Sequence, residues 1–164
     1  MDTEVLIFSD VNSSGHQHNI PSLPFSRYAG PHRLATELRD NGVTCRVIDY
    51  FTEFSLEQLT KIVERFVSKK TLIVGFSCTF LRDRHEPLGR SQDSVLSIIK
   101  ACKKINPYVH IVLGGATVTQ TGSPQLKLEL EKHIDFRLLG QCDYLLPQLV
   151  SQLKTGLPVK WTAT

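Results

Sequence analysis

Residues 72–79, Leu-Ile-Val-Gly-Phe-Ser-Cys-Thr, decide the fold of this chain together with residues 109–116, Val-His-Ile-Val-Leu-Gly-Gly-Ala. In both stretches an apolar run ends in small residues, as expected where a buried parallel strand ends and the backbone must allow a close approach. Ligands of open α/β sheets bind in the crevice beyond the carboxyl ends of the strands. Two such endings therefore predict a ligand that lies across them.

Five apolar segments alternate with five amphipathic segments along the chain. The expected strands are residues 5–8, 43–48, 72–76, 109–113 and 134–138. The expected helices begin at Pro31, at the capping box Ser55–Gln58, after the charged segment 82–87, at Ser123-Pro124 and near Asp143. Strict alternation of this kind is typical of a parallel sheet with right-handed crossovers.

The hydrophobic patterns of the segments also indicate the order of the strands. Residues 5–8, 72–76 and 109–113 are continuous apolar runs and predict central strands, whereas the other two segments alternate and predict edge strands. This pattern predicts a flavodoxin-like (Rossmann-like) three-layer α/β sandwich with strand order 2-1-3-4-5. We assign residues 1–156 to this domain and residues 157–164 to a tail or the start of a linker.

Composition limits the class of partner. The net charge is +3, with 41% hydrophobic and 21% charged residues, and Lys and Arg are spread along the chain, so nothing indicates nucleic-acid binding. The longest apolar run is far shorter than the roughly 20 residues of a membrane span, and the N-terminus does not resemble a signal peptide. We therefore expect a cytoplasmic protein. The four cysteines lie far apart and are expected to be reduced and mostly buried.

Several ligands of such folds can be weighed from the residues. A dinucleotide site would need Gly-x-Gly-x-x-Gly after the first strand, and this motif is missing. A phosphorylated receiver would need clustered acids there, an Asp ending the third strand and a Lys ending the fifth, but Ser77 and Leu139-Gly140 occupy the last two places. A flavin-phosphate loop at Ser13-Ser14-Gly15 stays open, although the long connection 11–29 suits it poorly.

Four segments resemble parts of cobalamin-binding domains. Phe76-Ser77-Cys78-Thr79 followed by Leu113-Gly114-Gly115 resembles their Ser-x-Leu (or Ser-x-Thr) and Gly-Gly signatures. Residues 30–50 resemble the first helix and second strand of the cobalamin-binding half of radical S-adenosylmethionine enzymes. Residues 137–143 resemble the Gly-Glu-Gly-Glu turn after their fifth strand. The resemblance covers about residues 4 to 155.

The resemblance implies a site at the carboxyl edge of the sheet, which we call the rim. In such domains the nucleotide tail of the corrinoid leaves the cobalt and threads between strands and loops. Gly114, Gly115 and Gly140 would provide a slot for the flat benzimidazole and ribose, and Ser77 and Thr79 would offer hydroxyls. The expected cofactor-binding residues are Ser9, Asp10, Ser77, Cys78, Thr79, Gly114, Gly115, Ala116, Gly140 and Gln141.

One family motif is missing. Corrinoid methyltransferases and mutases take a lower cobalt ligand from Asp-x-His-x-x-Gly, which does not occur in this chain. Asp10 is followed at other spacings by His16 and His18, in a long connection that is expected to cover the site. Either imidazole could reach cobalt from such a loop, but solvated loop histidines are commoner. The radical enzymes often bind cobalamin without a histidine of the protein on the metal. We therefore expect that the cobalt has either His16 or His18 as a ligand or no histidine ligand at all.

The resemblance implies a cobalamin-binding module that holds a corrinoid base-off for a radical S-adenosylmethionine partner domain, in methyl transfer or related radical chemistry. The Cys-x-x-x-Cys-x-x-Cys motif is absent from the chain, so the iron-sulfur cluster and S-adenosylmethionine would belong to a barrel in cis or in trans. The chain alone is expected to be non-catalytic, as a fragment, a free-standing carrier or a relic. The alternatives are a small flavodoxin-like enzyme acting on a phosphorylated ligand at the same rim and a ligand-free interaction module.

Overall fold

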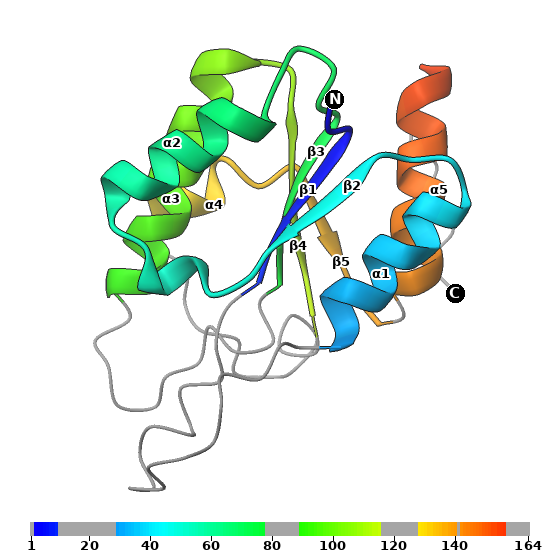
Figure 1. The fold of residues 1–164 in the computed structure, drawn as a ribbon, viewed down its shortest axis with the longest axis horizontal. Helices are drawn as coiled ribbons and strands as arrows, with labels where there is room; N and C mark the ends of the chain where they lie inside the picture. The colour runs from blue at the N-terminus through cyan, green and yellow to red at the C-terminus, as the bar shows by residue number, and fades with distance from the viewer. Residues whose placement is uncertain (1, 10–28, 78–88, 116–127, 141, 157–164) are drawn as a thin grey trace, which may run out of the picture.

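The computed structural model of the chain describes residues 2–9, 29–77, 89–115, 128–140 and 142–156. Within these residues one parallel sheet has the order β2-β1-β3-β4-β5 (Figure 1). The strands are β1 (Val5–Phe8), β2 (Cys45–Ile48), β3 (Ile73–Ser77), β4 (His110–Gly114) and β5 (Phe136–Leu138). The predicted flavodoxin-like fold is therefore confirmed, with β1, β3 and β4 in the centre and β2 and β5 at the edges.

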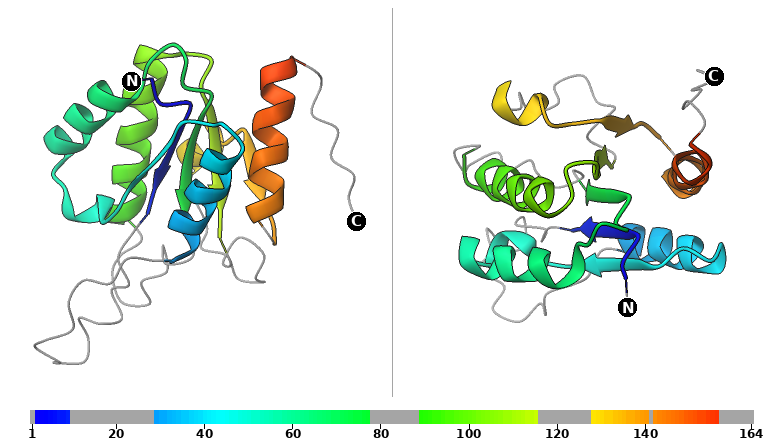
Figure 2. Two further views of the ribbon diagram at one scale, coloured as in Figure 1. Left: turned by 45° about the vertical axis from the view of Figure 1, so that its right-hand side comes forward. Right: turned by 90° about the horizontal axis from the view of Figure 1, so that it is seen from above.

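The helices cover the two faces of the sheet unequally. They are α1 (Ala29–Asp40), η2 (Phe51–Glu53), α2 (Leu56–Phe66), α3 (Gly89–Ile105), α4 (Leu128–Glu131) and α5 (Cys142–Thr155). Among these elements, α2, α3 and α4 lie on one face, and α1 and α5 lie on the other (Figure 2). For α1 to α4 this division follows from right-handed crossovers, because the chain moves in one direction from β1 to β2 and in the opposite direction in every later crossover. α5 follows the last strand and packs beside α1. We call the side of α1 and α5 the two-helix face.

Each face of the sheet has its own hydrophobic core. Below α2 and α3, Phe8 and Phe76 stack with ring centroids 5.5 Å apart, and Phe51 meets both rings edge-on at 6.0 and 6.1 Å. On the two-helix face, Ala35 and Leu38 of α1 and the inner leucines of α5 pack on the strands. Successive side chains along each central strand therefore point into two separate cores, as the continuous apolar runs predict.

The observed beginnings of two helices can be compared with those predicted from local sequence signals. The capping box predicted at α2 is present, because Ser55 Oγ accepts from the backbone of Gln58 and the Gln58 side chain accepts from the backbone of Ser55. α1 begins at Ala29, two residues before the predicted start at Pro31. Proline is tolerated in a first turn, where its missing N–H has no helical partner. The predicted start of the fourth helix at Ser123-Pro124 lies outside the described residues.

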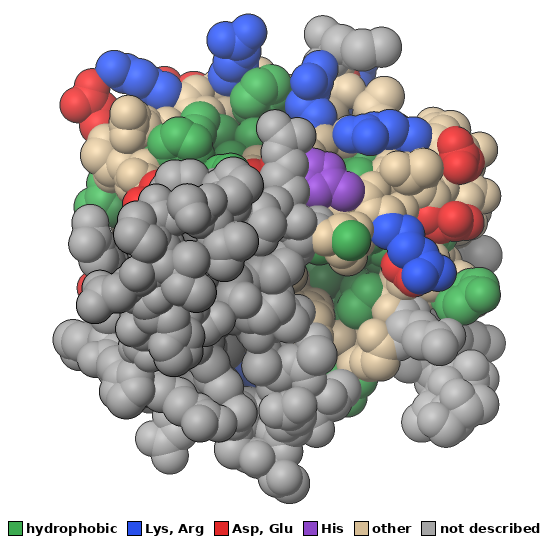
Figure 3. Space-filling view, turned by 60° about the horizontal axis from the view of Figure 1, so that its bottom comes forward, with side chains coloured by type: hydrophobic (Ala, Val, Ile, Leu, Met, Phe, Trp, Pro, Cys, Tyr) green, Lys and Arg blue, Asp and Glu red, His purple; other side chains and the backbone are tan. Residues whose placement is uncertain are grey.

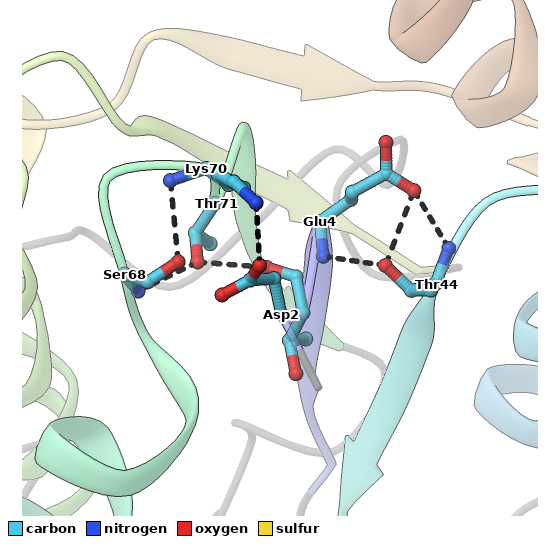
Figure 4. A network of polar contacts seen from close by, with 7 residues as sticks. Asp2, Glu4, Thr44, Ser68, Lys70 and Thr71 are labelled. Carbon is cyan, nitrogen blue, oxygen red and sulfur yellow. Dashed lines mark hydrogen bonds and ion pairs between the residues drawn. The ribbon is translucent and has the colours of Figure 1, made fainter.

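A polar network fastens the amino ends of the strands (Figure 4). The carboxylate of Glu4 accepts hydrogen bonds from the backbone N–H (2.8 Å) and hydroxyl (3.1 Å) of Thr44 at the beginning of β2, and pairs with Lys154 of α5 at 2.6 Å. Thr71 donates its hydroxyl to the carbonyl of Thr3 at 2.7 Å. Burial alone would raise the pKa of Glu4, but its hydrogen bonds with Lys154 and Thr44 outweigh burial and lower it.

We predict that Glu4→Gln destabilises the fold near neutral pH and that the effect fades in acid. A lowered pKa means that the ionised carboxylate stabilises the fold above the ordinary pKa of glutamate, and that this stabilisation is lost as the pH falls through the folded-state pKa. The expected loss is about 1 kcal/mol at neutral pH, because Gln keeps one acceptor for Thr44 but loses the charge that pairs with Lys154. Urea unfolding of wild type and Glu4→Gln, from neutral pH down to acid below the pKa of Glu4, measures the difference in their free energies of unfolding.

The control for this prediction is Glu57→Gln. Glu57 forms an exposed pair with Lys61 four residues later on the same helix, and its removal should change stability little. A pH-independent difference between wild type and Glu4→Gln would show that the charge of Glu4 contributes nothing.

Candidate functional site

A cavity of about 340 Å³ lies at the rim on the two-helix face, between the beginnings of α1 and α5. We call this cavity the slot. It is lined by Ile7, Gly30, Pro31, Leu34, Gly75, Phe76, Ser77, Val112, Gly114, Gly115, Leu138, Gly140, Cys142, Asp143 and Leu146. Figure 3 looks onto the rim, where hydrophobic side chains are visible in a hollow beside charged side chains of both signs. The slot volume falls within the range of roughly 300–1,000 Å³ that is usual for small-molecule sites.

The floor of the slot depends on Gly75. This residue pairs in register with Ile7 of β1 and Val112 of β4, so it is the one position without a side chain in that row. A Cβ placed on Gly75 would meet only Ile7 Cγ1 and the Val112 carbonyl oxygen, both at 3.9 Å, which is ordinary contact distance. A longer side chain would therefore fit the strand and project into the slot.

The wall next to β4 is formed by Cys142, the first residue of α5. A Cβ on Gly114 would lie 3.4 Å from Cys142 Sγ, so the thiol occupies the space that a side chain at position 114 would need. Its Sγ contacts the carbonyl oxygens of Leu138 (3.8 Å) and Gly140 (3.7 Å). Burial is the main cause that raises the pKa of the Cys142 thiol, which keeps it protonated at neutral pH.

Two glycines at the rim have backbone conformations that other residues rarely adopt. Gly115 follows β4 with φ 118°, and Gly140 follows β5 with φ 85°. A side chain at either position would be strained, so glycine is needed here to turn the chain where it lines the slot.

Charged residues stand at the mouth of the slot. Arg33 of α1 and Asp143 of α5 form an ion pair, with Nη2 3.1 Å from Oδ2. Asp143 lines the slot, whereas the Arg33 side chain is 75% exposed. The pair therefore connects the two helices at the outer edge of an otherwise largely apolar cavity.

A second pair lies at the rim but outside the slot. His32 Nε2 is 3.0 Å from both carboxylate oxygens of Asp49, which follows β2. The carboxylate is largely buried and the imidazole is partly exposed. The pair fixes the first turn of α1 to the carboxyl end of β2, and the sequence analysis did not predict it.

The structure brings together four of the predicted binding residues. Ser77, Gly114, Gly115 and Gly140 all line the slot. Ser9 follows β1 and does not line the slot; this residue is buried, and its hydroxyl oxygen has no hydrogen-bond partner among the described residues. The other predicted residues lie outside the described part of the chain: Asp10, His16, His18, Cys78, Thr79, Ala116 and Gln141.

The floor and the helical walls of the slot were not predicted from the sequence. Gly75 interrupts the apolar run of β3, and an isolated glycine in a strand is a signal of close backbone approach. The walls Leu34 and Leu146 have no such signal, because they read as ordinary core positions of amphipathic helices. Right-handed crossovers place the first helix on the face opposite the second, third and fourth helices, but they do not fix the side of the last helix, because no strand of the described sheet follows it.

No three His, Cys, Asp or Glu side chains among the described residues are arranged to hold a metal ion. No helix in this part of the chain has the length and apolar character needed to cross a membrane.

Comparison with known proteins identifies no family for the chain. No model of a protein family matches the chain, and no curated protein sequence matches it. Among solved structures, it is similar to the CheY-like protein TadZ from Pseudomonas aeruginosa, with 16% identity, a TM-score of 0.47 and coverage of 90% of this chain and 98% of TadZ.

Two further solved structures are similar. One is RcsB, solved as dimers bound to DNA, with 15% identity, a TM-score of 0.46 and coverage of 99% of this chain and 64% of the other. Another is a variant of the esterase AlinE4, with 17% identity, a TM-score of 0.41 and coverage of 96% and 74%. At these identities the likeness concerns the fold alone.

We predict that the three described cysteines differ in reactivity because only Cys142 reaches the slot. Burial raises the pKa of Cys45 and Cys102 to about 12, so both should resist alkylation in the folded protein. Cys142 is half-buried and should react slowly but before the other two. A time course with iodoacetamide, followed by peptide mass spectrometry, measures this order. Modification of Cys45 or Cys102 as fast as Cys142 would contradict the slot geometry.

Proposed function

We propose that the chain is a corrinoid-carrying module whose slot takes the nucleotide tail of base-off cobalamin. The observation that carries this proposal is the convergence of four residues. Ser77, Gly114, Gly115 and Gly140 come from the ends of three strands, each belongs to a segment that resembles cobalamin-binding domains, and all of them line one cavity.

The chemistry of the slot fits a flat heteroaromatic group. Gly75 leaves a gap between the side chains of Ile7 and Val112 on the sheet side, while Leu34 of α1 and Leu146 of α5 supply apolar walls. Such walls favour an aromatic ring through removal of apolar surface from water. Ser77, at the carboxyl end of β3, is the polar group that would donate a hydrogen bond to a ring nitrogen or a ribose oxygen.

The residues of this chain would bind and orient the cofactor. A bound corrinoid supplies methyl-transfer or radical chemistry at cobalt, and the protein positions it. The slot would fix the nucleotide tail and exclude water from the benzimidazole. The exposed corrin face would then be open to a partner domain carrying the iron-sulfur cluster and S-adenosylmethionine, in cis or in trans. His16 or His18 as a cobalt ligand belongs to the same proposal, and both lie outside the described residues.

A competing function also has an observation in its favour. An imidazole oriented by a carboxylate, as in the His32–Asp49 pair, is the arrangement of a general base, and it would suit a small enzyme acting on a phosphorylated ligand at the rim. His32 does not line the slot, however, so this hypothesis leaves the glycine floor unexplained. The ligand-free interaction module leaves the floor unexplained as well.

We predict that the purified chain binds hydroxocobalamin with a base-off absorption spectrum and that Gly75→Val weakens binding at least about tenfold, or ~1.4 kcal/mol. Valine suits a strand, and its methyl groups would occupy the space of the benzimidazole. Spectroscopic titration gives the spectrum and the dissociation constant. Thermal unfolding should show that Gly75→Val is at least as stable as wild type, because added methyl groups fill a cavity.

A matched control adds apolar atoms away from the slot. Thr60→Leu on the exposed side of α2 should bind cobalamin as wild type does. Absence of a base-off spectrum at saturating hydroxocobalamin, or equal affinity of wild type and Gly75→Val, would overturn the proposal.

A further inference from the structure

We propose that Arg33 recognises a phosphate at the mouth of the slot, so that the site selects ligands in which a planar apolar base is joined through a sugar to a phosphate. This inference rests on the proposed function and deepens it, because it assigns a ligand group to a residue that does not itself line the cavity. It follows from the position of the Arg33–Asp143 pair and from the difference in polarity between the largely apolar slot and its charged mouth.

The geometry places the guanidinium of Arg33 beside the opening. Asp143 is one of the lining residues, and Arg33 Nη2 lies 3.1 Å from its carboxylate. On α1, Gly30 and Leu34 line the slot on either side of Arg33 in the sequence. With 75% of its side chain exposed, Arg33 lies outside the cavity and contacts its wall through Asp143.

The ion pair leaves Arg33 able to bind an anion. A guanidinium carries five N–H donors, and the ion pair with Asp143 is made through Nη2. Asp143 thus holds the side chain over the mouth, which lowers the entropy lost when a ligand binds. Arginine matches phosphate in shape as well as charge, because its planar fork can donate two parallel hydrogen bonds.

The surroundings of the pair favour negative charge on the ligand. α1 and α5 both begin at the mouth, and the partial positive charge of helix N-termini attracts anions. The first turn of α1 holds no acidic residue, and Asp143 in the first turn of α5 is already paired with Arg33. A phosphate would not enter the slot, where Leu34, Val112 and Leu146 offer no hydrogen-bonding side chain. The base therefore occupies the slot, and the phosphate stays at Arg33.

Three fragments of the corrinoid tail test this assignment: 5,6-dimethylbenzimidazole, its ribonucleoside and the ribonucleoside 3′-phosphate. Isothermal titration of the whole chain should show the phosphorylated fragment binding about tenfold more tightly than the nucleoside. Arg33→Ala should remove that difference and leave the affinity for the nucleoside unchanged. The phosphate-dependent gain should also shrink as salt is added, because Arg33 is exposed.

The control is Lys100→Ala, which removes the cation of another exposed ion pair, Lys100–Glu129, on the other face of the sheet. It should keep the phosphate-dependent gain, as should Arg33→Lys in part. Binding of the nucleoside and the nucleotide with equal affinity in wild type would overturn the role of Arg33 and leave the slot proposal standing. Failure of all three fragments and of hydroxocobalamin to bind would overturn both.

Discussion

In the described part of the chain, two helices cover one face of a five-stranded sheet, and this coverage is the constraint on which the site depends. α1 packs against β2 and α5 against β5, at opposite edges of the sheet. The strip over β3 at the rim is left for side chains of the strands to fill, and the row there contains Gly75. A larger residue at this position would fill the cavity. The slot therefore exists because Gly75 has no side chain where the helices do not cover the sheet.

The two ends of the sheet are built differently. At the amino ends, the Glu4 carboxylate connects β1, β2 and α5, and Thr71 connects β3 to the residues before β1, so this end is fixed by direct hydrogen bonds. At the rim, glycines replace side chains, and the exposed Arg33–Asp143 ion pair joins α1 to α5. Hydrogen bonds at the amino ends of the strands therefore hold the strands in register, although the rim at their carboxyl ends contains a cavity.

Much of this architecture could be predicted from sequence, and the reasons are physical. Continuous apolar runs at residues 5–8, 72–76 and 109–113 require burial on both faces, which fixed the central strands and with them the strand order. Gly114, Gly115 and Gly140 were predictable as site residues because small residues at strand ends mark close approach. Leu34, Leu146 and the Arg33–Asp143 pair were not, because periodicity shows that a helical face is buried but not which neighbour it meets.

The most direct test of the central claim is the response of the glycine amides to cobalamin. In a protein labelled with ¹⁵N at glycine alone, addition of hydroxocobalamin should shift the amide signals of Gly75, Gly114, Gly115 and Gly140, which surround the slot. Gly42 and Gly156 lie at the ends of α1 and α5 away from the rim and should not shift. Shifts confined to Gly42 and Gly156, or unchanged slot glycines at saturation, would show that the slot is not where this protein binds a corrinoid.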